Sequence, residues 1–464
     1  MSRADGGRAP GRSPARDDRF ALAMKSPFLV IAILAMLVLF FFAKLAFSGQ
    51  ILARGDTFLY FYPYWQVAAD ALGSGRVPLW NPDIFMGAPL LANSQAGFFY
   101  PLNWPVWLLF STPFAISASI LLHVTIAGCG AYLAARRTLD LERLAALFAG
   151  ALFALGGYLT AQVEHVNQLQ GMAWLPWQFA ALAPLVASES RNRSWRGYLP
   201  VILATGVLFA LQLLAGHTQT TFITGVALAI WLVFHAARKP GRAGKLMRYL
   251  FVLVASVMLA AMLAAVQLLP TLELTGQSSR QGGLLLNEVL SFSWHPLLLA
   301  QAILPNYSGA FYTEYVFYVP LTAIALAMVG AWSWRKYPAA APWLWLSIVT
   351  IILAFGRFTP AYYLLGRLPG FDLFRAPARW LAVAALAVAL LAALGWQRLR
   401  RYADSERLPD ERRAIILPLV CAGIGIALLI LWRFVAGRLV GLVPLGPEAP
   451  YTAPDPRALL LWLS

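Results

Sequence analysis

Residues 55–104 read GDTFLYFYPYWQVAADALGSGRVPLWNPDIFMGAPLLANSQAGFFYPLNW and follow soon after the first apolar run of the chain. This stretch is too polar to cross a membrane and too aromatic to be a solvated loop. It opens on Asp56, continues through an amphipathic run over 60–72, and then carries turn signals at 73–75 (GSG) and 81–82 (NP). Because aromatic rings with a polar edge prefer the membrane–water boundary, we expect a structured loop lying on that interface. Its aromatic residues include Phe58, Tyr60, Phe61, Tyr62, Tyr64, Trp65, Trp80, Phe98, Phe99 and Tyr100.

The composition defines a membrane protein. Of the 464 residues, 60% are hydrophobic and 12% are charged, whereas soluble domains carry about 25% charged residues. The formal net charge of +16 does not indicate nucleic-acid binding, because the basic residues form short clusters between apolar runs. Cys129 and Cys421 both lie inside apolar runs, so the sequence contains neither a disulfide framework nor a cysteine metal motif.

Eleven apolar runs predict an all-α polytopic bundle of about eleven transmembrane helices, with interfacial helices in the outer loops. A twelfth run begins near residue 457 and stops with the chain. A helix cannot end in mid-bilayer with bare carbonyl groups, so we expect a C-terminally truncated sequence. Residues 1–25 predict a disordered cytoplasmic tail, and 26–464 predict a single transmembrane domain. The eleven runs lie at roughly 26–47, 113–134, 144–163, 171–187, 199–215, 222–237, 250–269, 316–333, 339–356, 380–397 and 414–432.

The distribution of Lys and Arg predicts the orientation. Strict alternation of eleven spans puts 25 basic residues on the side of the N-terminus and 9 on the opposite side. The positive-inside rule therefore predicts a cytoplasmic N-terminus and an outward-facing aromatic loop. The outer loops, at 48–112, 270–315 and 357–379, are longer and carry more varied polar residues, so we expect the function on the outer face.

Asp56 is the first candidate for chemistry. It is interpreted either as a helix cap or solvated interfacial acid, or as a general base in a partly dehydrated cleft. Glu164 is the best second acid, and His165 and His217 lie at outer ends of spans. Each histidine alone is typical of a structural role, but their shared face indicates that one or two line a polar cleft. No acids have Asp-x-Asp spacing, so the sequence alone predicts no metal site and leaves a divalent metal undetermined.

Outward arginines break the positive-inside trend. Arg280 is interpreted either as a ligand of a lipid-linked phosphate, through its planar fork of donors, or as the partner of Glu273 or Glu288. Residues 357–379 carry four more arginines, which indicate anionic partners. They are Arg357, Arg367, Arg375 and Arg379.

Three motifs resemble the YfhO-like bacterial membrane proteins. They are the aromatic loop itself, the pair SSRQGG (278–283) and WHPLLLAQAILPNYSG (294–309), and YYLLGRLPGFDLFRAPARWL (362–381). The resemblance covers about residues 28–432 in the expected order. It implies membership of the GT-C superfamily of membrane glycosyltransferases. It also implies a many-helix bundle in the bacterial cytoplasmic membrane, an outward active site, a polyprenyl-phosphate sugar donor and an acid in the first outer loop, which Asp56 matches.

The leading hypothesis is therefore a membrane glycosyltransferase that moves a sugar from a polyprenyl phosphate to a glycan or glycolipid acceptor. We expect contacts with membrane lipids and no binding of nucleic acid. Asp56 is the predicted base, and Arg280 or the pair Arg375 and Arg379 would stabilise the leaving phosphate. Tyr60 and Trp80 would stack on sugar faces or anchor the loop. The alternatives are a transporter of lipid-linked saccharides and a non-catalytic scaffold of an envelope-assembly complex. The remaining predicted substrate-binding residues are Glu164, His165 and His217.

Overall fold

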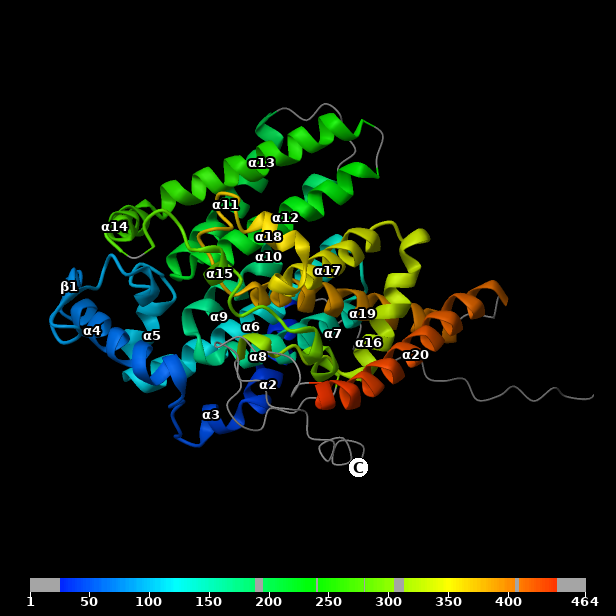
Figure 1. Cartoon of the computed structure of the whole chain (residues 1–464), viewed down its shortest axis with the longest axis horizontal. Coiled ribbons are helices and arrows are strands. Elements are labelled where there is room, and N and C mark those ends of the chain that lie inside the picture. The colour runs from blue at the N-terminus through cyan, green and yellow to red at the C-terminus, as the bar shows by residue number, and fades with distance from the viewer. Residues whose placement is uncertain are drawn as a thin grey trace, which may run out of the picture.

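The computed structural model describes residues 26–187, 195–238, 241–278, 280–303, 313–404 and 409–439. The predicted disordered tail over 1–25 and the apolar run near residue 457 lie outside these residues. The first half of the described chain is mainly helical (Figure 1). Its helices are α2 (Pro27–Phe41), α3 (Ala43–Phe47), α4 (Tyr62–Gly73), α5 (Asn103–Leu109), α6 (Thr112–Thr138), α7 (Arg143–Ala154), α8 (Gly157–Ala161), α9 (Val166–Ala173), α10 (Leu175–Ala187), α11 (Leu199–Leu214) and α12 (Thr218–Ala237).

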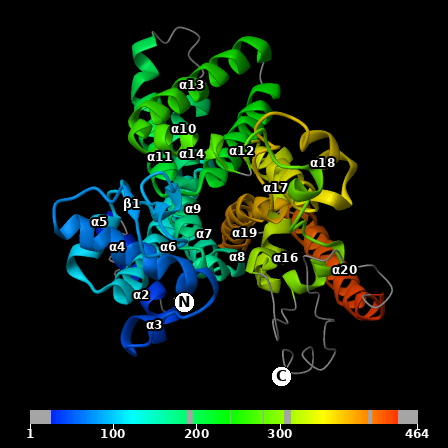
Figure 2. The same cartoon turned by 60° about the vertical axis from the view of Figure 1, so that its left-hand side comes forward.

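The rest of the described chain continues as helices joined by short turns. These helices are α13 (Arg242–Leu263), α14 (Ala265–Gly276), α15 (Leu286–Val289), α16 (Leu321–Trp332), α17 (Ala340–Ala354), α18 (Pro360–Leu365), α19 (Leu381–Asp404) and α20 (Pro409–Leu439). In both views α11 and α13 lie on one side of the molecule, while α16 and α20 lie on another (Figures 1 and 2).

The all-α membrane class is confirmed, whereas the predicted span count is not. Every predicted run forms helix, but the run at 144–163 breaks between α7 and α8, and the run at 171–187 breaks between α9 and α10. Within the described residues, five helices are long and apolar enough to cross a membrane, and four more apolar helices are shorter. The five are Thr112–Thr138, Arg143–Glu164, Thr218–Ala237, Arg242–Leu263 and Pro377–Ala403.

The aromatic loop folds into a compact structure of its own beside α5 and α6. Helix α4 buries Tyr64, Trp65, Ala68 and Ala71, which are spaced so that one face of the helix turns inward. The turn after it forms a two-residue antiparallel ladder, in which β1 (Trp80–Asn81) pairs with β2 (Ala88–Pro89). The sequence prediction of a structured loop agrees with this arrangement.

Helix α19 is the centre of the bundle. It packs against α16, α17 and α7, and 83% of the apolar stretch within Pro377–Ala403 is buried inside the protein. Two glycines bring α16 and α19 into backbone contact, as small residues do in membrane bundles. A Cβ atom on Gly395 would lie 1.9 Å from the carbonyl oxygen of Leu326, and one on Gly330 would lie 2.0 Å from that of Leu391.

We predict that Gly395→Ala destabilises the protein, since its new methyl group has to push α16 away from α19. Overpacking of this kind costs about 1–3 kcal/mol, so the melting temperature in detergent should fall. Gly225→Ala in α12 is the matched control, because nothing lies within 4 Å of a Cβ there. Equal melting of Gly395→Ala and wild type would contradict the close packing of the two helices.

Candidate active site

One cavity of about 540 Å³ collects polar side chains from several segments that connect helices in the described chain. Its wall includes residues from the turn before α4, the turns between α8 and α9 and between α11 and α12, the C-terminal half of α14, and the segment that leads into α19. Seven of the side chains predicted from sequence line it. They are Asp56, Glu164, His165, His217, Arg280, Arg375 and Arg379.

Asp56 faces this cavity from an unusual piece of backbone. Gly55 before it has a positive φ of 49°, and the chain after it forms one turn of π-helix over Thr57–Phe61. Such π-turns are rare and occur frequently at functional sites. The Oδ2 atom of Asp56 lies 3.6 Å from Nε2 of His165, and the Asp56 side chain is 63% exposed. Asp56 is thus accessible from the cavity and is oriented by an imidazole.

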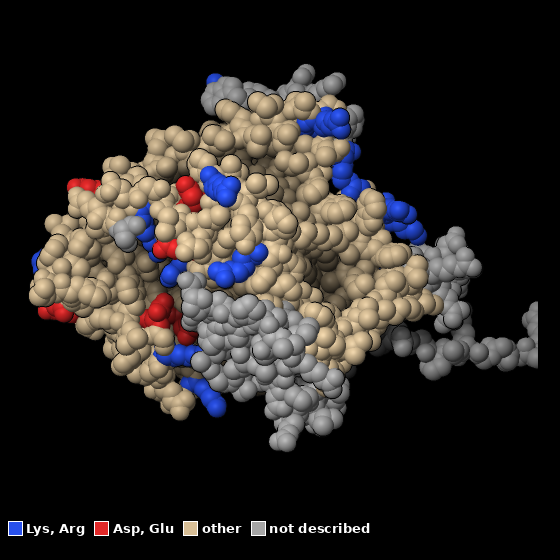
Figure 3. All heavy atoms as spheres, in the orientation of Figure 1, with Lys and Arg blue, Asp and Glu red and all other residues tan. Residues whose placement is uncertain are grey.

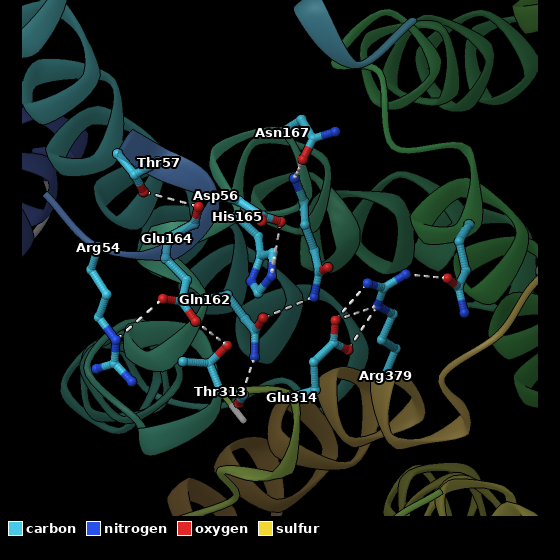
Figure 4. Close-up of polar contacts among 12 residues, drawn as sticks. Arg54, Asp56, Thr57, Gln162, Glu164, His165, Asn167, Thr313, Glu314 and Arg379 are labelled. Atoms are coloured by element: carbon cyan, nitrogen blue, oxygen red, sulfur yellow. Dashed lines mark hydrogen bonds and ion pairs between the residues drawn. The ribbon is translucent and has the colours of Figure 1, made fainter. Parts of the chain in front are cut away.

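Glu164 lies beside Asp56 but is engaged by protein groups. Its Oε1 accepts a hydrogen bond from the hydroxyl of Thr313 at 2.7 Å, and its Oε2 lies 3.4 Å from Nε of Arg54. Its backbone carbonyl accepts a hydrogen bond from the hydroxyl of Thr57 at 3.0 Å. Figure 4 shows these bonds converging on Glu164 from both sides.

Glu314 is a functional candidate that the sequence analysis missed. Its carboxylate binds the Arg379 guanidinium through both oxygens, at 2.8 Å to Nε and 2.5 Å to Nη2. The same guanidinium donates a hydrogen bond to Oε1 of Gln219 at 2.5 Å, and this arrangement is drawn in Figure 4. Glu314 is an acid just before the apolar run at 316–333, as Asp56 is an acid just after the run at 26–47, so the sequence did contain a signal.

Burial and Arg379 act in opposite directions on the Glu314 carboxyl. Burial alone would raise the pKa of Glu314, but the positive charge and hydrogen bonds of Arg379 outweigh it, so the pKa lies below its ordinary range. The pair is therefore ionised at neutral pH. Arg379 is committed to this pair, so it is a fixed charge in the wall rather than a free ligand for an anion.

Arg280 and Arg375 have no ion pair with any carboxylate in the described parts of the chain. Burial lowers the pKa of Arg280, and the neighbouring positive charges of Arg375 and Arg379 lower it further. The predicted alternative partner Glu288 instead accepts a hydrogen bond from the backbone N–H of Leu285. The Arg375 guanidinium lies 5.5 Å from the ring centre of Phe292. Like charges held together in this way favour an anion between them.

His217 is a neutral member of the wall. Its Nδ1 lies 2.6 Å from the hydroxyl of Thr220. Burial lowers the pKa of His217 well below the ordinary histidine value, and the charges of Arg379 and His165 act in the same direction. At neutral pH its imidazole therefore offers one donor and one acceptor and adds no charge.

Tyr60 and Trp80 lie outside the lining of this cavity. Tyr60 stacks on Tyr64 with ring centres 4.1 Å apart, and its hydroxyl accepts a hydrogen bond from Asn93. Trp80 covers Gly87, where a Cβ would lie 2.7 Å from the indole. These contacts fit the anchoring role for the two rings.

The described residues contain no group of three or more His, Cys, Asp or Glu side chains that could hold a metal ion. Two of the acids that line the cavity are already occupied, since Glu164 pairs with Arg54 and Glu314 with Arg379.

Solved structures share the fold of this chain. No family model matches the sequence, and no curated protein matches it. The oligosaccharyltransferase AglB from Archaeoglobus fulgidus, in complex with an inhibitory peptide and a dolichol-phosphate, superposes with a TM-score of 0.51 at 14% identity, over 95% of this chain and 61% of AglB. The apo form from the same organism gives 0.46 at 14% identity, over 92% and 60%. ArnT from Cupriavidus metallidurans bound to undecaprenyl phosphate gives 0.41 at 12% identity, over 89% and 72%.

The similarity to AglB shows the fold alone: this chain has a helical membrane fold like that of the oligosaccharyltransferase. The chain spans about three fifths of the length of the oligosaccharyltransferase. The narrower assignment to the YfhO-like family stays a prediction from the sequence motifs.

We predict that Glu314→Gln destabilises the protein strongly, since it leaves the Arg379 charge buried without a counter-ion. Breaking a buried pair costs about 3–5 kcal/mol. Glu142→Gln is the control, because the pair of Glu142 with Arg401 is about half exposed and such pairs contribute about 0–1 kcal/mol. Thermal melting in detergent measures both variants.

The pH dependence of the same variant has a definite sign. Because the pKa of Glu314 is lowered in the fold, its stabilisation is complete above the ordinary glutamate pKa of about 4.3 and is lost as the pH falls through the lowered value. The difference in melting between wild type and Glu314→Gln should therefore shrink on acidification. A difference that is independent of pH would contradict the ionised pair.

Proposed function

We propose that this protein is a membrane glycosyltransferase that transfers a sugar from a polyprenyl-phosphate donor to a hydroxyl group of an envelope glycan or glycolipid. The observation that carries the proposal is the cavity itself. An accessible carboxylate, Asp56, and two arginines, Arg280 and Arg375, line this one cavity. A base and an unpaired cationic surface are the two groups that glycosyl transfer from a phosphate requires.

In the proposed reaction Asp56 accepts the proton of the acceptor hydroxyl. The hydroxyl oxygen forms a bond to the anomeric carbon of the donor sugar, and the bond from that carbon to the phosphate oxygen breaks. The electron pair leaves with the phosphate, which stays attached to its lipid. Arg280 and Arg375 hold the charge that develops there, and His165 orients the base.

The donor class follows from the location. Nucleotide sugars are cytoplasmic, so an outward-facing enzyme needs a lipid-linked donor and a site open to the bilayer. The fold similarity to a protein solved with a dolichol-phosphate supports this class. The Lys and Arg asymmetry supports an outward cavity in a bacterial cytoplasmic membrane with the N-terminus inside.

A transporter of lipid-linked saccharides and a non-catalytic scaffold are the competing functions. A transporter needs a polar path at mid-membrane. Within the described spans His123 is buried, and its ring is held by the hydroxyl of Tyr100 and the carbonyl of Ser119. It therefore serves as a satisfied structural group, which favours the enzyme over the transporter.

We predict that Asp56→Asn lowers transfer by about 10²–10⁴-fold, since it removes the proton acceptor. The assay is sugar transfer in reconstituted membranes from a panel of undecaprenyl-phosphate sugars. Asp83→Asn is the control, because it makes the same chemical change in the same loop on a residue that does not line the cavity. Full transfer by Asp56→Asn would reject the base, and no transfer by wild type from any donor would reject the enzyme.

We predict that Arg280→Ala and Arg375→Ala each weaken product inhibition by undecaprenyl phosphate about tenfold or more, because a charge-assisted hydrogen bond contributes about 1.5–3 kcal/mol. Arg280→Lys should recover only part of the effect, since lysine lacks the planar fork. Arg367→Ala serves as the control, because Arg367 is exposed and does not line the cavity. Unchanged inhibition constants in both variants would remove these arginines from the donor site.

A further inference from the structure

Glu164 holds residues on both sides of Asp56, Arg54 before it and Thr57 directly after it. Its Oε2 pairs with Nε of Arg54 at 3.4 Å, and its backbone carbonyl accepts the hydroxyl hydrogen bond of Thr57 at 3.0 Å. Arg54 and Thr57 are also joined to each other, because the backbone N–H of Thr57 donates to the carbonyl of Arg54 at 3.2 Å. The turn that carries Asp56 is therefore closed on itself and fastened to Glu164.

The close approach of Gly55 to Glu164 shows how tightly this turn is seated. A Cβ atom on Gly55 would lie 2.9 Å from Oε2 of Glu164, and the φ of 49° at Gly55 also favours glycine. Thr57 is fully buried. The next residue after Glu164, His165, contacts the carboxylate of Asp56 itself. Two consecutive residues thus fix both the backbone and the side chain of the base.

The other carboxylate oxygen of Glu164 reaches the opposite wall of the cavity. It accepts the hydrogen bond of the Thr313 hydroxyl at 2.7 Å, and Thr313 is buried. Its neighbour Glu314 carries the ion pair with Arg379. Glu164 therefore links the turn that carries Asp56 to the segment of Thr313 and Glu314, which binds Arg379 (Figure 4).

We infer that Glu164 is a positioning residue, which sets the place of Asp56 relative to the phosphate-binding arginines and does not bind substrate itself. The inference rests on the proposed function and deepens it, since it separates the two acids on this side of the cavity by role. Asp56 is exposed and free to take a proton, whereas both oxygens of Glu164 are occupied by protein groups and its side chain is 13% exposed.

The test compares Glu164→Ala with Glu164→Gln. Alanine removes both contacts of the side chain, and glutamine keeps the size of the side chain and the acceptor for Thr313. A displacement of about 1 Å at a reacting group costs about 10²-fold in rate, so kcat of Glu164→Ala should fall by about that factor. KM for donor and for acceptor should stay within about twofold of wild type, and Glu164→Gln should recover most of kcat. Glu273→Ala, the loss of another outer-face acid outside the cavity lining, should change neither constant.

Two results would overturn the role. A rise in KM with unchanged kcat would make Glu164 a substrate ligand, and unchanged kcat and KM in Glu164→Ala would remove Glu164 from the positioning of Asp56. In an Asp56→Asn background, Glu164→Ala should cost no more than about twofold further, because a residue that acts through Asp56 has nothing left to position. A full additional loss in that background would likewise refute the role.

A second readout does not depend on activity. Amide hydrogen exchange at Thr57, followed by mass spectrometry in nanodiscs, should accelerate in Glu164→Ala and stay unchanged in Glu273→Ala. Unchanged exchange at Thr57 in Glu164→Ala would refute positioning even if wild type transferred no sugar. Absent transfer together with accelerated exchange would reject the proposed function and leave the role of Glu164 in the turn standing.

Discussion

A carboxylate and a guanidinium buried side by side set the geometry of the cavity wall. The desolvation of either charge alone costs several kcal/mol, so Glu314 and Arg379 have to enter the protein together. Arg379 lies just before α19, and Glu314 lies just before the run that becomes α16. Gln219, at the start of α12, accepts a hydrogen bond from Arg379 and donates one to the carbonyl of Arg375. One pair therefore ties three segments to the mouth of the cavity.

The rigidity of this arrangement comes from the bundle below it. The glycine contact between α16 and α19 leaves no space for sliding, because each helix presents backbone to backbone at Gly330 and Gly395. Protein interiors packed at this density transmit displacements rather than absorb them. The glycine contacts therefore fix the separation of α16 and α19 along the part of the two helices that carries Gly330 and Gly395. On the face of the molecule drawn in Figure 3, Lys, Arg, Asp and Glu residues are few, and other residue types cover most of the described surface.

The sequence predicted an all-α membrane fold, because hydropathy is a property of local segments. Three of the residues that it singled out, Asp56, His165 and Arg280, line one cavity in the fold, and each is a charged or titratable residue between apolar runs. The sequence prediction missed the pairing of charges. Glu314 and Arg379 are 65 residues apart, and Glu164 and Thr313 are 149 apart, and no local pattern encodes such contacts. The breaks inside the runs at 144–163 and 171–187 were missed for a related reason, because a kink leaves the mean hydropathy of a run unchanged.

The pairing changes what the outward arginines mean. In the sequence, one short segment carries four arginines, which indicates anionic partners. They are Arg357, Arg367, Arg375 and Arg379. In the fold only Arg375 and Arg379 line the cavity, and Arg379 is neutralised by Glu314. The net positive charge that a phosphate would meet therefore comes from Arg375 together with Arg280, from a different loop. Both of these arginines are exposed, whereas the Arg379 charge is held against Glu314. The buried pair thus organises the wall, and Arg280 and Arg375 carry the unpaired positive charge of the cavity.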